Sequence, residues 1–301
     1  MAILPINAGR PHAPGLLPLA ARLESDAPII VMIHGYRYCP FRPEHDPHRH
    51  ILGLDPHLPG ARRLRSWPRA LGFTADGDEG LGIAFGWSAR GSLASAYRKA
   101  GHVGAELGRL IAEISQRAGR PVHLIGHSLG ARVALQAVAA TQPGSVGRLI
   151  LMSAAELQPE AETAMDSPAG HKAEVINVTS RENDPFDLGL ELLVARARSR
   201  ALGLGLSAPR RNWLDLQIDG AEMRAGLAAL GFDIGDEASR ACHWSPYLRE
   251  GLFDFYRVAL AQPWALPLPL LRAHLPTGQS RRWSRLLQPP KRLQSFSFSN
   301  A

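Results

Sequence analysis

Short apolar runs recur along the chain and are separated by longer stretches of mixed polarity. The runs are continuous rather than alternating, which is typical of strands that are covered on both faces of a parallel sheet. They predict six strands, at residues 28–35, 81–87, 121–127, 146–154, 173–180 and 213–219. The last run, W-L-D-L-Q-I-D, alternates apolar and polar residues and is therefore predicted to be an edge strand.

Helical patterns fill the gaps between these runs. Residues 92–118 carry an apolar stripe at helical spacing, and residues 129–140 follow the third strand directly. Residues 245–261 begin with Ser-Pro, a typical helix start, and predict one final helix. This alternation predicts an α/β fold with a mostly parallel, doubly wound sheet of about six to eight strands flanked by helices.

Two segments interrupt this alternation. Residues 37–66 form a polar insert with four histidines, and residues 186–211 are apolar with a streak of arginines. Insertions of this size between sheet elements often form lids or caps over a site. We therefore predict a single domain over 1–264 with two inserted lid or cap segments, followed by a basic tail over 265–301.

The charge is unevenly distributed. The chain has 34 basic and 27 acidic residues, but six basic and no acidic residues follow position 264, so the body has 28 and 27. A nearly neutral body argues against a nucleic-acid-binding protein. The tail is predicted to be a mobile, solubilising end, with weak contact to an anionic membrane or a partner as the alternative.

The remaining composition restricts the class of protein further. No apolar run reaches the roughly 18 residues that a membrane span needs, so stable membrane insertion is not expected. Prolines interrupt the first 15 residues, which are predicted to be an ordered arm or a frayed end rather than a signal peptide. A cytoplasmic location follows by default, and two cysteines do not suggest a disulfide framework. The oligomeric state is left open.

The stretch G-H-S-L-G at 126–130 carries the main chemical signal. It lies between a predicted strand and a predicted helix, the context of a nucleophile elbow. Ser128 must occupy a strained turn, and Gly126 and Gly130 allow strand and helix to pass closely. The alternative is a serine that caps a helix, which does not require glycines at both offsets. The pattern therefore predicts that Ser128 is a nucleophile.

A serine nucleophile needs a base and an acid, which follow it in that order in this type of fold. His243 lies just before the last predicted helix and is predicted to be the general base. Asp184 follows the fifth predicted strand and is predicted to orient the imidazole, although an Asx turn before Pro185 would also explain it. The other carboxylates considered for this role are Asp187, Glu182 and Glu156.

The oxyanion hole requires two backbone N–H groups. Leu129, directly after the nucleophile, is predicted to give one of them. Tyr36, in the turn I-H-G-Y after the first predicted strand, is predicted to give the other.

With these motifs in the order H-G-Y, G-H-S-L-G, N-D-P and H-W, the sequence resembles the α/β-hydrolase superfamily over roughly residues 28–262. The stretch F-G-W-S-A-R-G-S-L-A-S-A-Y at 85–97 also looks like a bacterial group of unassigned substrate. The resemblance implies hydrolysis of an ester, thioester or amide through an acyl-serine intermediate, with no metal and no organic cofactor. Only about 27 residues precede the first predicted strand, so the leading antiparallel strands of the family are expected to be short or missing.

The expected activity is that of an esterase or lipase-like serine hydrolase acting on a small-molecule acyl ester. A thioesterase, amidase or acyltransferase on the same triad is the first alternative. A catalytically idle hydrolase fold used as a binding module is the second. The histidine-rich insert has the composition of a metal site, but its spacing favours a solvated loop. Cys39 and Cys242 are expected to approach the same end of the sheet.

Overall fold

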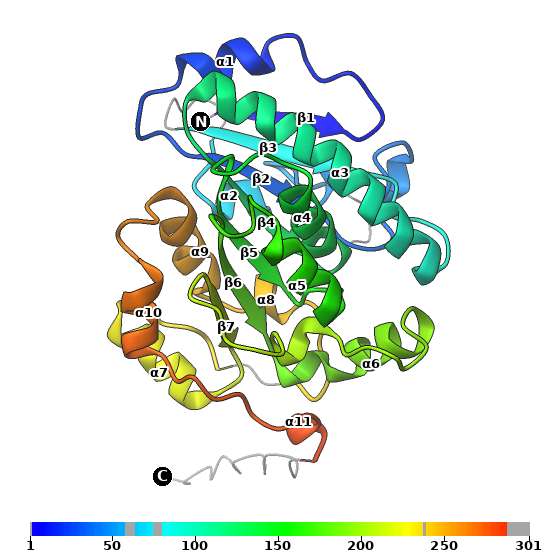
Figure 1. Cartoon of the computed structure of the whole chain (residues 1–301), viewed down its shortest axis with the longest axis vertical. Helices are drawn as coiled ribbons and strands as arrows, with labels where there is room; N and C mark the ends of the chain where they lie inside the picture. The colour runs from blue at the N-terminus through cyan, green and yellow to red at the C-terminus, as the bar shows by residue number, and fades with distance from the viewer. Residues whose placement is uncertain (1, 58–63, 75–79, 237–238, 288–301) are drawn as a thin grey trace, which may run out of the picture.

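A computed structural model describes residues 2–57, 64–74, 80–236 and 239–287 of the 301-residue chain. Its centre is a seven-stranded sheet with the order β1-β3-β2-β4-β5-β6-β7, in which every neighbouring pair is parallel (Figure 1). The strands are β1 (Ala2–Asn7), β2 (Ile29–Ile33), β3 (Leu81–Gly86), β4 (Val122–His127), β5 (Val146–Met152), β6 (Glu174–Thr179) and β7 (Trp213–Gln217). All six predicted strands are confirmed, and β7 lies at the edge as expected.

The other edge strand, β1, was not predicted. Residues 2–7 pair in parallel with β3, and Pro5 lies opposite Ala84. A proline is tolerated in an edge strand because one side of the strand needs no ladder partner. Of the two expectations for this position, an ordered arm or a frayed end, the frayed end is wrong, and the ordered segment is a strand of the sheet.

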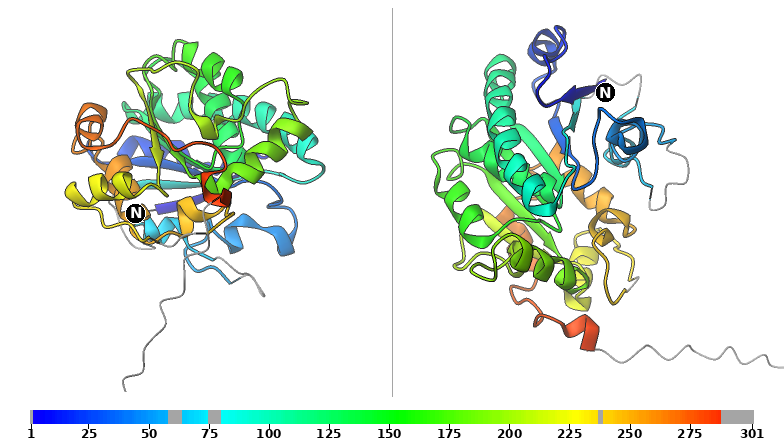
Figure 2. Two further views of the ribbon diagram at one scale, coloured as in Figure 1. Left: turned by 90° about the horizontal axis from the view of Figure 1, so that it is seen from below. Right: turned by 90° about the vertical axis from the view of Figure 1, so that its right-hand side faces the viewer.

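Helices cover both faces of the sheet (Figures 1 and 2). On one face lie α1 (Leu16–Arg22), α3 (Leu93–Ala118), α4 (Leu129–Ala139) and α5 (Gln158–Asp166). On the other lie α2 (Trp67–Ala70), α7 (Ala221–Ala229), α8 (Ser245–Leu248), α9 (Leu252–Ala261) and α10 (Leu268–His274). This two-sided cover explains the continuous apolar runs, because Ile29, Val31 and Ile33 of β2 pack into one cluster while Ile30 and Met32 pack into the other.

Short elements complete the fold. These are the 3₁₀ turns η1 (Pro43–His45), η2 (Pro47–Arg49), η3 (Arg181–Asn183) and η4 (Leu202–Leu204), and the helices α6 (Asp184–Leu193) and α11 (Ser284–Leu287). Helix α6 follows β6 through η3, so it begins close to the carboxyl end of the sheet. None of the described helices is long and apolar enough to cross a membrane.

The final helix is interrupted, contrary to the prediction of one helix over 245–261. It consists of α8 and α9, separated at residues 249–251. Gly251 has a φ of 78°, and a Cβ there would overlap the carbonyl oxygen of Asp233. Arg249 lies at this break, and its buried guanidinium pairs with the carboxylate of Glu182.

The described part of the tail is folded onto the domain. Leu268 and Leu271 of α10 are 1% and 0% exposed and belong to the hydrophobic cluster beneath the sheet. The Arg272 guanidinium donates to the carbonyl oxygens of Arg211 and Trp213 at 2.7 and 2.8 Å. The predicted boundary after residue 264 therefore cuts through the core, and a mobile tail is a wrong description of residues 265–287.

Candidate active site

Ser128 lies on a strained turn between β4 and α4. Its backbone has φ 57° and ψ −122°, a conformation that non-glycine residues rarely adopt. A Cβ on Gly126 would lie 2.6 Å from the carbonyl carbon of Gly130, and a Cβ on Gly130 would overlap the carbonyl oxygen of Ile33. Both glycines are therefore required by close backbone contacts. Because a capping serine needs neither the strain nor these contacts, the geometry is that of a nucleophile elbow.

The turn faces a cavity of about 440 Å³. Apolar and aromatic side chains dominate its walls, together with Ser128, two histidines and one arginine. The lining residues are Gly35, Tyr36, Arg37, Tyr38, Leu93, His127, Ser128, Ala155, Pro185, Phe186, Gly189, Leu190, His243, Trp244 and Tyr247. The cavity has the size and character of a small-molecule site.

The two predicted cap segments contribute only part of this wall. Arg37 and Tyr38 come from the start of the 37–66 insert, and Phe186, Gly189 and Leu190 come from α6. The other described residues of the histidine-rich insert do not line the cavity. His48 bonds through Nε2 to Asn7 Oδ1 at 2.8 Å, and His50 bonds through Nδ1 to the Tyr38 hydroxyl at 2.7 Å.

His243 lies at the cavity, and its partner is Asn183. The imidazole Nδ1 lies 2.6 Å from Asn183 Oδ1. The orientation of this amide is set from its other side, because Asn183 Nδ2 donates to Asp187 Oδ1 at 2.9 Å. In this orientation the amide oxygen faces the imidazole and accepts, so Nδ1 carries the proton and Nε2 is the nitrogen that accepts one.

The structure does not bring Asp184 to the imidazole, which corrects the sequence prediction. Its carboxylate accepts the N–H of Trp283 at 2.6 Å and pairs with Arg181 at 3.2 Å. Asp184 is the first residue of α6, and the preceding residue, the last of η3, is the one that faces His243. Within the N-D-P stretch the Asn faces His243, whereas the sequence favours the Asp because a carboxylate would stabilise the imidazolium.

The other carboxylates considered have different roles. Glu156 is fully buried, pairs with Arg132 at 2.7 Å and also accepts a hydrogen bond from the Tyr97 hydroxyl. Burial raises the pKa of Glu156, and Arg132 opposes this shift. Asp187 lies behind Asn183, and burial raises its pKa to about 8.

Glu182 holds the loop that carries His243. Its carboxylate accepts hydrogen bonds from the Ser239 N–H at 2.8 Å, the Arg249 guanidinium at 3.1 Å and the Ser245 hydroxyl. Its carbonyl oxygen also accepts the N–H of Cys242 at 2.9 Å. The Glu182 carboxylate thus holds residues before and after His243 in the long connection that follows β7.

His127, the residue before the nucleophile, links the elbow to the base. Its Nε2 donates to the carbonyl oxygen of His243 at 2.9 Å, and the two ring centroids are 4.6 Å apart. Burial lowers the pKa of His127 to about 4. Burial and the neighbouring His127 also hold the pKa of His243 well below its usual value. Both rings are therefore neutral at pH 7, and His243 is available as a base.

The two predicted oxyanion donors lie on either side of the elbow. Leu129 begins α4, so its N–H has no partner within the helix. A Cβ on Gly35 would lie 2.8 Å from Ser128 Cβ, which places the Gly35–Tyr36 turn directly against the nucleophile. The Tyr36 hydroxyl donates to the carbonyl oxygen of Gly91 at 2.5 Å and so fixes its ring at the cavity.

Cys39 and Cys242 are both free thiols, the first buried and the second half-buried. Their proximity stays a prediction. Among the described residues, no group of three or more His, Cys, Asp or Glu side chains is arranged to hold a metal ion.

Comparison with known proteins adds little to this geometry. No family model matches the sequence, and no curated protein matches it. Among solved structures, the chain is similar to lipase BlEst2 of Bacillus licheniformis in propeptide form, at 15% identity and a TM-score of 0.30 over 54% of this chain and 38% of that one. It is also similar to lipase B of Aspergillus fumigatus, at 14% identity and a TM-score of 0.33 over 92% of this chain and 73% of that one.

The chain thus spans well under half of the first of these lipases. Likenesses this weak carry no argument about activity. The strand order and the elbow after β4 carry the conclusion that this chain has an α/β-hydrolase fold.

Proposed function

We propose that the protein is a serine hydrolase that cleaves carboxylic esters, with Ser128, His243 and Asn183 as its triad. The observation that carries the proposal is the strained elbow at Ser128 facing a cavity that His243 also lines. A binding module has no need of a strained serine, because such a conformation costs energy without adding a contact.

The reaction follows from these positions. Ser128 Oγ attacks the ester carbonyl carbon while His243 Nε2 takes the hydroxyl proton, and the carbonyl electron pair moves onto oxygen. The N–H groups of Leu129 and Tyr36 bind that oxyanion. The tetrahedral intermediate then collapses, the alcohol leaves with the proton from His243, and water repeats the sequence on the acyl-serine.

Asn183 keeps the imidazole in the productive tautomer. An amide does this as a hydrogen-bond acceptor, as in Cys–His–Asn proteases, but it brings no full charge to the imidazolium that forms. Asp187 lies behind the amide and accepts its N–H, so the polar chain runs from His243 through Asn183 to a buried carboxyl group.

The walls of the cavity favour an apolar acyl group. Phe186 stacks on the His243 ring with centroids 4.8 Å apart, and Leu93 and Leu190 extend the apolar wall. Thioester, amide and acyl-transfer chemistry use the same triad, so a panel of nitrophenyl esters of rising acyl length, with matched thioesters and anilides, tests the substrate class.

A fluorophosphonate probe tests the mechanism directly. Wild-type protein should be labelled with one equivalent, and Ser128→Ala should not be labelled. Thr141→Ala, a hydroxyl deletion after the end of α4, is the matched control and should be labelled like the wild type. Equal labelling of wild type and Ser128→Ala, or labelling of neither, contradicts the proposal.

A further inference from the structure

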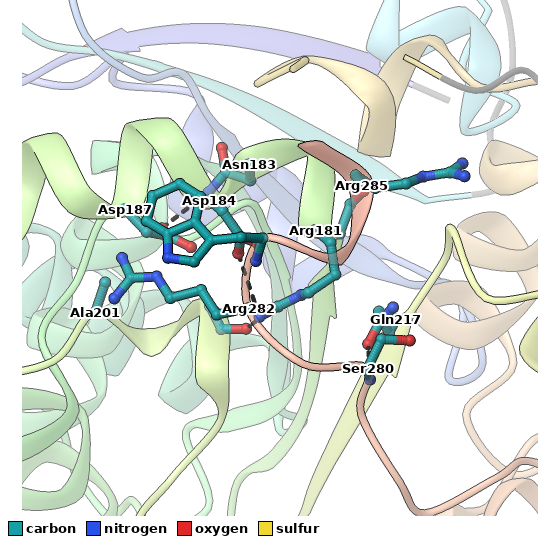
Figure 3. A network of polar contacts seen from close by, with 12 residues as sticks. Arg181, Asn183, Asp184, Asp187, Ala201, Gln217, Ser280, Arg282 and Arg285 are labelled. Carbon is teal, nitrogen blue, oxygen red and sulfur yellow. Dashed lines mark hydrogen bonds and ion pairs between the residues drawn. The ribbon is translucent and has the colours of Figure 1, made fainter. Parts of the chain in front are cut away.

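Residues 276–287, here named the C-terminal strap, run from α10 past the end of β7 to α6 (Figures 1 and 3). The N–H of Ser280 donates to Gln217 Oε1 at 2.7 Å, at the carboxyl end of β7. The strap then reaches the segment Arg181–Glu191, which carries Asn183. Arg282 and Arg285, two of the basic residues that looked like a solubilising tail in the sequence, therefore lie against the segment that carries Asn183.

Three contacts join the strap to this segment. The Arg282 guanidinium donates to both carboxylate oxygens of Glu191, at 2.9 and 3.1 Å. The N–H of Trp283 donates to Asp184 Oδ2 at 2.6 Å. Arg285 lies 3.7 Å from Glu182, the carboxylate that holds the histidine loop.

The backbone at the contact is strained. Trp283 has a φ of 67°, which a non-glycine residue keeps only where its surroundings hold it. The Asp184 carboxylate accepts the N–H of Trp283 itself, and the preceding residue, Arg282, pairs with Glu191. These contacts hold Trp283 in this conformation.

Helix α6 lies between the strap and the cavity. Asp184, Asp187 and Glu191 follow one another at spacings of three and four residues and so share one face of the helix. Phe186 and Leu190, four residues apart, line the cavity from another face. A displacement of α6 would therefore move the partner of His243 and the acyl wall together.

Charge explains why the strap is needed there. Four paired carboxylates gather around η3 and α6, namely Glu182, Asp184, Glu191 and Asp219, and each is buried or nearly so. Arg181 and Arg249 pair with two of them, and the strap brings Arg282 and Arg285 as two further cations. Buried carboxylates left without a cation are costly, so the strap stabilises this arrangement of α6.

We propose that the strap is a positioning element of the active site, in which Arg282 and Trp283 hold α6, and α6 holds Asn183 against His243. The inference rests on the proposed hydrolase activity. Arg282 and Trp283 touch no reacting atom and act only through Glu191 and Asp184.

The test uses the full chain with Arg282→Gln, and Arg281→Gln as the matched control. Arg281 is the neighbouring arginine and is exposed, with no ion pair to the described residues. Rates are measured per serine titrated by fluorophosphonate, so misfolded protein is not counted. Arg282→Gln should lower kcat about tenfold with a smaller change in KM for nitrophenyl acetate, whereas Arg281→Gln should match wild type.

A second variant separates positioning from general loss of stability. Glu191→Gln keeps an oxygen for the N–H of Ala201, which Glu191 now accepts at 2.9 Å, but removes the charge that Arg282 neutralises. The double variant of Arg282→Gln and Glu191→Gln leaves no buried charge unpaired at this contact. It should be no slower than Arg282→Gln alone, because both side chains act through one contact and their effects are not additive; a further loss in kcat would contradict the inference.

Each outcome decides a different claim. If Arg282→Gln matches Arg281→Gln in kcat per titrated serine, the strap has no positioning role. If it only lowers the amount of titratable enzyme, the strap is purely structural and the inference is also wrong. A wild-type chain that neither hydrolyses esters nor reacts with the probe refutes the proposed function, and this inference with it.

Discussion

The assignment of Asn183 in place of Asp184 can be tested by exchanging one side chain at a time. Asn183→Ala removes the acceptor that lies 2.6 Å from His243 Nδ1 and also leaves Asp187 Oδ1 without its donor. The imidazole then loses its defined tautomer. A positioned general base contributes about 10²- to 10⁴-fold, and we expect kcat/KM to fall about 100-fold. At about 1.36 kcal/mol per tenfold, this loss is about 2.7 kcal/mol of transition-state stabilisation.

The contrasting variant is Asp184→Asn, which removes the charge but keeps an oxygen to accept the N–H of Trp283. If Asp184 oriented His243, this change would cost about 10⁴-fold in kcat, as a triad carboxylate does elsewhere. We expect less than about a tenfold loss in kcat, because the carboxylate faces Arg181 and the strap rather than the imidazole; the loss of this buried ion pair should instead lower the temperature of thermal unfolding. Nitrophenyl ester hydrolysis and thermal unfolding of both variants are the measurements. A large loss in Asp184→Asn beside a nearly normal Asn183→Ala would refute the reasoning.

Four further predictions follow from the same geometry. Gly130→Ala should lower the free energy of unfolding by about 3 kcal/mol and abolish probe labelling, since its Cβ would overlap the carbonyl oxygen of Ile33; calorimetry and labelling check this. The kcat/KM should not decline as the pH falls from 7 through 6.5, because burial and the neighbouring His127 lower the pKa of His243 and keep it neutral there; a decline that begins near pH 7 would contradict it. His127→Ala should lower kcat about tenfold through loss of the bond to the His243 carbonyl, and His127→Gln, which keeps a donor, should restore most of it. Arg37→Gln should selectively reduce kcat/KM for an ester with a terminal carboxylate, measured against a neutral ester of equal length, because Arg37 is the cation among the lining residues described for the cavity.

The sequence by itself determined the elements that local patterns specify. Continuous apolar runs identify strands covered on both faces, and six of the seven strands followed from them. The G-H-S-L-G stretch also predicted the elbow, because strand, glycine spacing and helix are all close together along the chain. Ile29–Ile33 and Gly126–Gly130 are cases in which the neighbours in sequence already constrain the backbone.

The tertiary structure decided what depends on residues far apart in the sequence. Residues 2–7 form a strand by pairing with β3, and the helix over 245–261 is interrupted where Gly251 packs against Asp233 and Arg249 pairs with Glu182. The choice between Asn183 and Asp184 was of the same kind. Two adjacent residues point in different directions at the start of a helix, and only the positions of His243 and Trp283 show which of them reaches the imidazole.

The partners of charged residues also could not be read from the sequence. From composition, Arg282 and Arg285 were predicted to belong to a basic, solvated tail. Their buried partners Glu191, Glu182 and Asp219 come from segments 66 to 103 residues away, which no local pattern reveals. The pairing of buried charges depends on the three-dimensional packing of the chain. In this packing, residues 276–287 lie against α6 as the C-terminal strap and do not form a free tail.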